Sequence, residues 1–170
     1  MAALAHAQPR LAEFHWREHG EQVLEFQYEV YQRNFPGFTV GPTFLTDYER
    51  QLRTALRNPY EGLWVIEEDG VARAFLWAAI ITTLVDEKLG YIKNVYVSPD
   101  RRGLGWGAFL IKHAEGWMRG LGVTKSSLDV TVENATAVGL YTACGYHIQR
   151  HRMEKQLVPE PPPSGGKEPA

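Results

Sequence analysis

The chain has 170 residues and a formal net charge of -2, with 44% hydrophobic and 22% charged residues. These values are typical of one globular domain and exclude a disordered or fibrous protein. The charge balance lacks the basic excess that nucleic-acid binding requires. The single cysteine, Cys144, has no partner for an internal disulfide.

The two ends of the sequence differ from its middle. Residues 158–170 contain five prolines and two glycines, which predicts a disordered tail, and residues 1–9 are expected to be flexible. Residues 10–157 then form the folded domain. No basic leader opens the sequence, and the apolar stretch at residues 74–85 is too short to span a bilayer. We therefore expect a cytoplasmic protein that binds neither membrane nor nucleic acid.

The first part of the domain is predicted to contain one strand and two helices. Residues 10–16 have the composition of a strand, and residues 21–34 carry apolar side chains at helical spacing up to Pro36. Thr46 or Asp47 can cap a second helix, because both side chains accept hydrogen bonds from free amides. The second helix is expected to end before the next proline.

The middle of the chain is predicted to form a hairpin followed by a third strand. Residues 62–67 and 71–83 are rich in β-branched and aromatic side chains and are joined at Asp69-Gly70. This dipeptide favours a tight hairpin turn, in which both central residues need positive φ. Residues 90–97 are predicted to form the next strand.

The remaining elements alternate between helix and strand. The clearest is a helix over residues 106–121, which carries an apolar stripe over four turns and is stopped by Gly122. A fourth helix is capped by Asn134 and ends at a glycine. The strands predicted around these helices are residues 126–131, 146–149 and 152–157. The resulting order is β, α, α, β, β, β, α, β, α, β, β, an α/β (α+β) arrangement.

A glycine-rich segment joins the strand at 90–97 to the helix at 106–121. Amides at a helix start are unpaired and lie at the positive end of the helix dipole, so they can bind a phosphate. Glycines let a pyrophosphate approach the backbone, and Arg101 and Arg102 would add positive charge. The spacing excludes a P-loop and disfavours the dinucleotide fingerprint. A tight turn with solvated arginines is the alternative.

Two stretches of the sequence resemble the signatures of one family, the GNAT superfamily of N-acetyltransferases. The first is Arg102-Gly103-Leu104-Gly105-Trp106-Gly107, which matches Arg/Gln-x-x-Gly-x-Gly/Ala. The second, at residues 134–146, is similar to Asn-x-x-Ala-x-x-Leu-Tyr-x-x-x-Gly-Phe/Tyr. The resemblance implies a mixed, mostly antiparallel, twisted sheet of about seven strands with four flanking helices.

The resemblance also implies that the chain binds acetyl coenzyme A (acetyl-CoA). Val95 and Val97 would pair with the pantetheine arm beside a bulge that splays their strand from the next. Asn134 would reach the pantetheine, or act only as a helix cap. Tyr141 would protonate the departing thiolate or stabilise its charge, or would pack as a core aromatic. The amides expected to hold the pyrophosphate belong to Arg102, Gly103, Leu104, Gly105, Trp106, Gly107 and Ala108.

The general base is less well defined by the sequence. Residues 91–97 contain no carboxylate, so Asp129 is the first candidate, followed by Glu133 or a water molecule. Asp129 is equally compatible with a solvated strand position. Deprotonation at pH 7 costs about 4.6 kcal/mol for a lysine amine and about 1.4 kcal/mol for an α-amine. A remote base would therefore slightly favour weakly basic amines.

The acceptor pocket is expected to be formed by the first two helices and the loop between them. Phe35, Phe38 and Tyr48 belong to an aromatic cluster there, although such rings also close cores. Lys93 and Asn94 could project into the pocket or face solvent. No metal site is expected, because the two histidines at residues 147 and 151 have ligand spacing only on a helix and fall in predicted strands.

Together these features predict an acetyl-CoA-dependent N-acetyltransferase in which a primary amine attacks the thioester directly. The acceptor would be a small molecule or a peptide or protein N-terminus, and the chain could form a homodimer through its closing strands. The alternative is a non-catalytic sensor of the same fold that binds CoA or an acyl-CoA.

Overall fold

The computed structural model describes residues 8–35, 37–155 and 157. The predicted flexible start, apart from Gln8 and Pro9, and the predicted tail at 158–170 lie outside the described residues. None of the helices in the described ranges has the length and apolar character needed to cross a bilayer.

A five-stranded sheet lies at the centre of the described chain, in the order β1-β2-β3-β4-β5. Neighbouring strands are antiparallel, except that β4 and β5 run parallel. The strands are β1 (Arg10–Glu13), β2 (Glu61–Glu68), β3 (Val71–Ile81), β4 (Leu89–Val97) and β5 (Ser126–Ser127).

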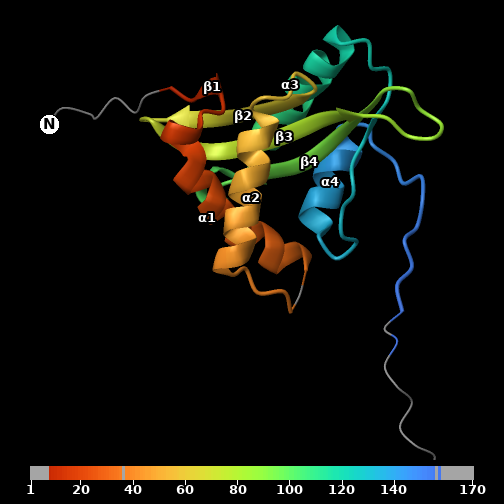
Figure 1. Ribbon diagram of the computed structural model, residues 1–170, viewed down its shortest axis with the longest axis horizontal. Coiled ribbons are helices and arrows are strands. Elements are labelled where there is room, and N and C mark those ends of the chain that lie inside the picture. The colour runs from red at the N-terminus through yellow and green to blue at the C-terminus, as the bar shows by residue number, and fades with distance from the viewer. Residues whose placement is uncertain (1–7, 36, 156, 158–170) are drawn as a thin grey trace, which may run out of the picture.

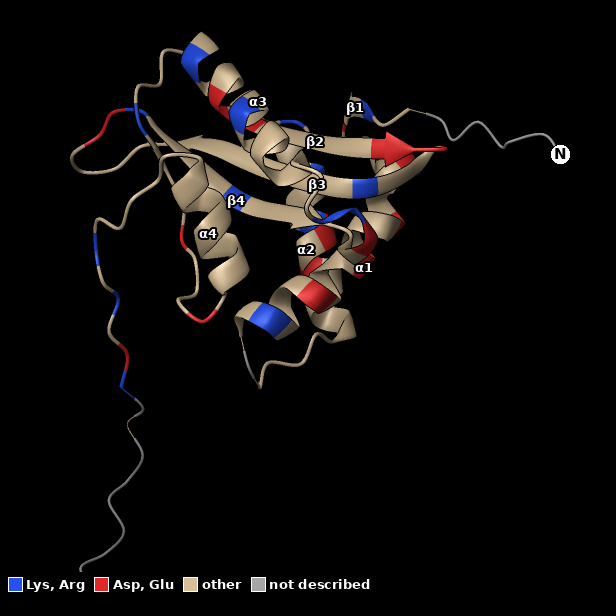
Figure 2. Ribbon diagram, turned by 180° about the vertical axis from the view of Figure 1, so that it is seen from behind, with Lys and Arg blue, Asp and Glu red and all other residues tan. Residues whose placement is uncertain are grey.

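Two helices cover each face of the sheet (Figure 1). α1 (Trp16–Asn34) and α2 (Pro42–Ala55) lie on one face, and α3 (Trp106–Gly120) and α4 (Ala135–Ala143) lie on the other. Alternation along β3 supplies both cores: Phe75 and Trp77 pack towards α1 and α2, whereas Leu76 packs towards α3. Figure 2 shows acidic and basic residues interspersed along the elements.

The helix and turn predictions agree with the structure, apart from two helix starts. Asp69 and Gly70 have φ of 52° and 75°, as the predicted hairpin turn requires. α1 begins at Trp16 rather than near residue 21. α2 begins at Pro42, ahead of Thr46 and Asp47, because proline is well suited to the first helical position.

The prediction of about seven strands is wrong, because the described residues form five. The strand expected at 126–131 is reduced to Ser126–Ser127, and the described residues of the two expected closing strands, 146–149 and 152–157, form no strand. Tyr146 packs on the core, but Ile148 is 70% exposed and Met153 is 92% exposed. Alternation alone cannot make a strand that lacks a partner to pair with.

The sheet opens along the second half of β4. Trp77 pairs with Asn94 and Ala78 pairs with Ile92, so Lys93 is an extra residue and β4 is bulged there. On the other side, β4 pairs with β5 only through residues 90 and 91. Within the described chain, residues 92–97 therefore have one free strand edge, which we call the split. This edge leads to the start of α3 and lies near α4 (Figure 1).

Candidate active site

The turn after β4 presents a row of unpaired amides at the start of α3. A short 3-10 helix (Pro99–Arg101) leads into it, and Gly103 and Gly105 have φ of 78° and 81°. Among the described residues, the amides of 103–108 have no protein acceptor, and the first paired amide is that of Phe109, bonded to the Gly105 carbonyl at 3.0 Å. A Cβ on Gly103 or Gly105 would meet no atom within 4 Å. This row of free amides, which we call the cradle, is open to solvent and fits a pyrophosphate.

Gly107 has a second role that the motif did not indicate. A Cβ at this position would lie 2.9 Å from Cδ2 of Leu140 on α4, which is closer than real Cβ contacts. Gly107 therefore lets α3 and α4 approach closely, while its amide stays free. A side chain at this position would require the end of the Leu140 side chain to move.

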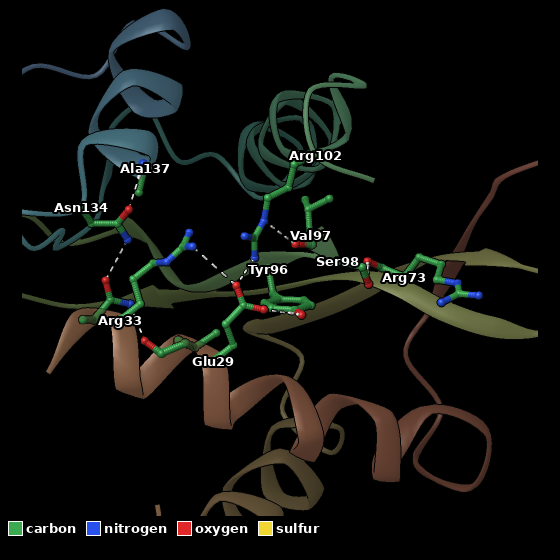
Figure 3. Close-up of polar contacts among 11 residues, drawn as sticks. Glu29, Arg33, Arg73, Tyr96, Val97, Ser98, Arg102, Asn134 and Ala137 are labelled. Carbon is green, nitrogen blue, oxygen red and sulfur yellow. Dashed lines mark hydrogen bonds and ion pairs between the residues drawn. The ribbon is translucent and has the colours of Figure 1, made fainter. Parts of the chain in front are cut away.

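The two arginines of the turn are held by protein groups. Nε of Arg101 donates to Glu68 Oε2 at 2.5 Å. Nε of Arg102 donates to the Val97 carbonyl at 3.0 Å, and its Nη2 pairs with Glu29 on α1 (Figure 3). The predicted phosphate-binding guanidinium groups are therefore already paired with carboxylates in this structure.

Glu29 is the centre of this network and was not identified from the sequence. Its Oε2 accepts a hydrogen bond from the Tyr96 hydroxyl at 2.8 Å, and Arg33 lies 3.8 Å from Oε1. Burial opposes its ionisation, but hydrogen bonds from Arg102 and Tyr96 outweigh this effect and lower the pKa of Glu29. Burial, with Glu29 as the next cause, raises the pKa of Tyr96 to about 12.

The opposite side of the split is also joined to α1. Asn134 caps α4 as predicted, since its Oδ1 accepts from the Ala137 amide at 3.2 Å (Figure 3). Its Nδ2 donates to Asn34 Oδ1 at 2.9 Å, and Thr131 Oγ1 donates to the Asn34 carbonyl at 3.1 Å. α1 therefore contacts both α4 and the turn before α3.

Tyr141 lies on α4, partly buried in the core on the α3 side. Its ring packs edge-on against Tyr146, with centroids 6.1 Å apart. Burial raises the pKa of Tyr141 to about 12. No group in the described chain forms a hydrogen bond with its hydroxyl, which is therefore a protonated donor without a protein partner.

The candidate bases differ in their surroundings. Asp129 is exposed, and its Oδ2 accepts from the Tyr91 hydroxyl on β4 at 2.8 Å. Burial, with Asp129 as the next cause, raises the pKa of Tyr91 to about 12. Glu133 is exposed on the loop before α4. A further carboxylate, Glu61 at the start of β2, lies beside Lys93. It was not identified from the sequence, because Glu61 is distant in sequence from the strand that carries Lys93.

The bulge directs Lys93 and Asn94 to the α1 and α2 face. Lys93 Nζ lies 4.2 Å from the centroid of the Trp77 ring. The Asn94 Nδ2 donates to Gln27 Oε1 at 2.9 Å and to the Tyr48 hydroxyl at 3.1 Å, whereas its Oδ1 is buried without a partner. Both residues thus face the expected acceptor side of the sheet.

The predicted aromatic cluster forms, but its members differ in exposure. Tyr31 packs on Phe35 and Phe38 with centroids 5.4 and 5.8 Å apart, and both phenylalanines are exposed. Tyr48 is only 5% exposed, and burial raises its pKa. Phe35 and Phe38 are accessible to a ligand, whereas Tyr48 belongs to the buried polar network with Asn94.

Comparisons with known proteins agree with this geometry. The model of the acetyltransferase (GNAT) family matches residues 21–146. The aminoglycoside N(6')-acetyltransferase type 1 of Klebsiella aerogenes is 33% identical over 92 residues, which are 52% of this chain and 60% of that relative. The chain thus spans about 60% of the length of this curated relative.

Two solved structures show the same fold. A putative acetyl transferase from Pyrococcus furiosus has a TM-score of 0.70 at 25% identity, covering 88% of this chain and 100% of its own. A predicted acetyltransferase from Clostridium acetobutylicum, solved with acetyl-CoA, has a TM-score of 0.73 at 17% identity, covering 88% and 97%. From the family match, the solved relatives and the amides at the start of α3, we conclude that this chain belongs to the GNAT acetyltransferase family.

Proposed function

We propose that this chain transfers the acetyl group of acetyl-CoA to a primary amine of a small molecule by direct attack of the amine. The row of unpaired amides at 103–108, beside the free edge of β4, is the observation that carries this proposal. Acetyl-CoA supplies an activated thioester carbonyl. The remaining chemistry belongs to side chains around the split.

The donor would be held along the start of α3 and the edge of β4. The free amides and the α3 dipole bind the pyrophosphate, and Val95 offers its backbone to the pantetheine arm. The Val97 carbonyl is already bonded to Arg102, so its share in holding the arm is small. Asn134 has one amide hydrogen left after bonding to Asn34, and this hydrogen can reach the donor.

Tyr141 would supply the proton that the departing thiolate needs. A free thiol has a pKa of about 8.5, so a phenol with a pKa of about 12 remains protonated and donates a hydrogen bond to the developing negative charge. Asp129, or a water molecule bound to it, accepts the proton released by the amine. Because Asp129 is exposed, such a water has a path to bulk solvent.

The acceptor is proposed to be a small molecule rather than a peptide. Proteins similar to this chain include an aminoglycoside N(6')-acetyltransferase and, at 20% identity, a glucosamine-6-phosphate N-acetyltransferase. A remote base favours weakly basic amines, because an amine of pKa near 8 loses its proton at a cost of only about 1.4 kcal/mol at pH 7.

The test measures release of the CoA thiol from acetyl-CoA with a panel of amino sugars, amino acids and polyamines. We expect amine-dependent turnover, which is reduced in Asp129→Asn. Calorimetry with CoA runs in parallel. Binding of CoA without turnover on any amine would support the sensor alternative, and absence of CoA binding would overturn the placement of the donor.

A further inference from the structure

A cavity of about 230 Å³ lies directly beside the bulge of β4. Its walls are Trp77 and Lys93 from the sheet, Glu61 from β2, and four residues of α2 that include Arg50. Lys93 is the bulged residue, so the cavity adjoins the part of β4 where the split begins. This position is suited to the acceptor of the proposed reaction.

The one carboxylate that lines this cavity is already occupied. Both oxygens of Glu61 lie within hydrogen-bond distance of Lys93 Nζ, at 3.2 and 3.1 Å, and Oε2 also accepts from the Trp77 indole. The Glu61 side chain is only 15% exposed. Glu61 therefore has little capacity left to bind the ammonium group of a ligand.

The positive groups around the cavity are more available. The Arg50 side chain is 74% exposed and uses one nitrogen, Nη2, to bond Asp47 Oδ1 at 2.8 Å. A second hollow shares Arg50 and is lined by Arg53 and Arg57 as well. Arg57 forms no side-chain hydrogen bond or ion pair within the described residues, whereas Arg53 pairs with Glu49 at 2.8 Å.

The charge around these two hollows is therefore positive on balance. The lining side chains include four cations, Arg50, Arg53, Arg57 and Lys93, and two carboxylates, Glu49 and Glu61. Asp47 pairs with Arg50, so the excess is one positive charge. A guanidinium fork such as that of Arg50 matches carboxylate and phosphate groups, with which it forms paired hydrogen bonds.

We infer that the natural acceptor is an amine that also carries an acid group, with the acid bound at Arg50 and the amine directed towards the bulge at Lys93. This inference rests on the proposed acetyltransferase function and specifies its substrate class. A carboxylate and a phosphate offer the same oxyanion chemistry to Arg50. Arg57, in the turn that follows α2, would add attraction without direct contact.

The experiment compares matched acceptors that differ only near the acid group. Glucosamine 6-phosphate is set against glucosamine, and phenylalanine against phenylalanine amide, in the thiol-release assay. Each kcat/KM is expressed per concentration of unprotonated amine, because amidation lowers the pKa of the α-amine. We expect each acid-bearing acceptor to have the higher kcat/KM, with a preference that weakens as ionic strength rises. The two pairs distinguish phosphate from carboxylate.

Variants then test whether Arg50 is responsible for the preference for acid-bearing acceptors. Arg50→Gln is expected to lower kcat/KM for the preferred acid-bearing acceptor about tenfold and to leave its neutral partner unchanged. Arg119→Gln on α3, on the opposite face of the sheet, is the control and should change neither value. Equal losses for both acceptors in Arg50→Gln, or a preference for the neutral amines, would overturn the inference.

A binding measurement separates this inference from the proposed function. Calorimetry titrates the same four amines into protein saturated with CoA, which requires no turnover. Tighter binding of the acid-bearing amines, lost in Arg50→Gln, supports the inference even if no acetylation occurs. Turnover of several amines without any such difference in binding would support the acetyltransferase function and contradict the proposed acid-binding site.

Discussion

At the scale of single residues, the site depends on partners that are distant in sequence. Arg102 was identified from its motif, but its partner Glu29 belongs to a helix that no local pattern connects to it. The same holds for Arg101 and Glu68. Motifs of this kind predict which backbone will bind a phosphate, whereas the ion pairs around it depend on the tertiary fold.

Tyr141→Phe removes only the hydroxyl that is proposed to protonate the thiolate. We expect kcat to fall at least tenfold, since general acid catalysis contributes about 10²–10⁴-fold, while the KM values change little. Because the pKa of Tyr141 is raised to about 12, its hydroxyl stays protonated below pH 10 and the loss should be uniform across pH 6–9. Steady-state assays over this range measure both effects.

Tyr146→Phe is the matched control for this prediction. Tyr146 packs against Tyr141, and its hydroxyl contacts Ser126 Oγ at 2.9 Å rather than the split. Its kcat should remain close to that of the parent protein. An equal loss in both variants would show that ring packing, and not proton donation by Tyr141, limits the rate.

Glu29→Gln tests how the acidic partner of Arg102 influences the donor site. The substitution removes a negative charge near the free amides and releases one arm of the Arg102 guanidinium. We expect CoA to bind about three- to tenfold more tightly. The repulsion between the Glu29 carboxylate and a nearby pyrophosphate contributes about 1 kcal/mol when salt does not screen it. Calorimetry at two salt concentrations measures the change, which should shrink at high salt.

Glu25→Gln, on an exposed position of the same helix, is the control for Glu29→Gln and should leave CoA affinity unchanged. Weaker binding in Glu29→Gln would instead mean that Glu29 serves mainly to hold Arg102 in place.

At the scale of elements, sequence patterns predicted the structure where local chemistry decides it. Asp69 and Gly70 adopt the positive φ that their turn requires, and Asn134 caps α4. The predictions of strands at 146–149 and 152–157 were wrong because an alternating pattern does not show whether a neighbouring strand edge is available for pairing. The bulge at Lys93 likewise depends on the register with β3, and it is this bulge that places Lys93 and Asn94 together.

Gly105→Ala tests two roles of this glycine at the start of α3, its backbone conformation and the space that it leaves for a ligand. With φ of 81°, an alanine should destabilise the protein by about 1–2 kcal/mol, and its Cβ would also project into the open cradle. We expect weaker CoA binding in addition to the lower stability. Chemical denaturation and calorimetry measure the two quantities separately.

Gly122→Ala provides the matched comparison at the other end of the same helix, where φ is 79°. Its stability should fall by a similar amount, with CoA affinity unchanged. If both variants lost affinity equally, the effect at Gly105 would be one of helix stability alone.

At the scale of the whole molecule, a buried carboxylate with charged and polar partners makes stability depend on pH. Glu67 on β2 is 7% exposed and bonds to Arg10 Nη2 and His19 Nε2, both at 2.6 Å. The hydrogen bond from Arg10, together with His19, lowers the pKa of Glu67 against the effect of burial. The unfolded chain therefore binds more protons, so this stability is present above pH 4.5 and is lost as the pH falls through the lower folded value.

Glu67→Gln should reduce the free energy of unfolding at pH 7 by about 1.5–3 kcal/mol, the range for hydrogen bonds to charged groups. Its stability should also decline less than that of the parent protein between pH 7 and pH 3.5. Urea unfolding at several pH values measures both. Glu21→Gln on the exposed side of α1 is the control, and the prediction is wrong if its pH dependence matches that of Glu67→Gln.

The contacts of α1 couple the binding of acetyl-CoA to the binding of the acceptor amine. Glu29 and Asn34 attach this helix to the turn before α3 and to the cap of α4, and Gln27 attaches it to Asn94 beside the acceptor cavity. A nucleotide that shifts α1 when it binds at the start of α3 also shifts Gln27 and its partner Asn94, which is next to Lys93 of the cavity wall. By reciprocity of binding energies, the amine then alters nucleotide affinity by the same factor.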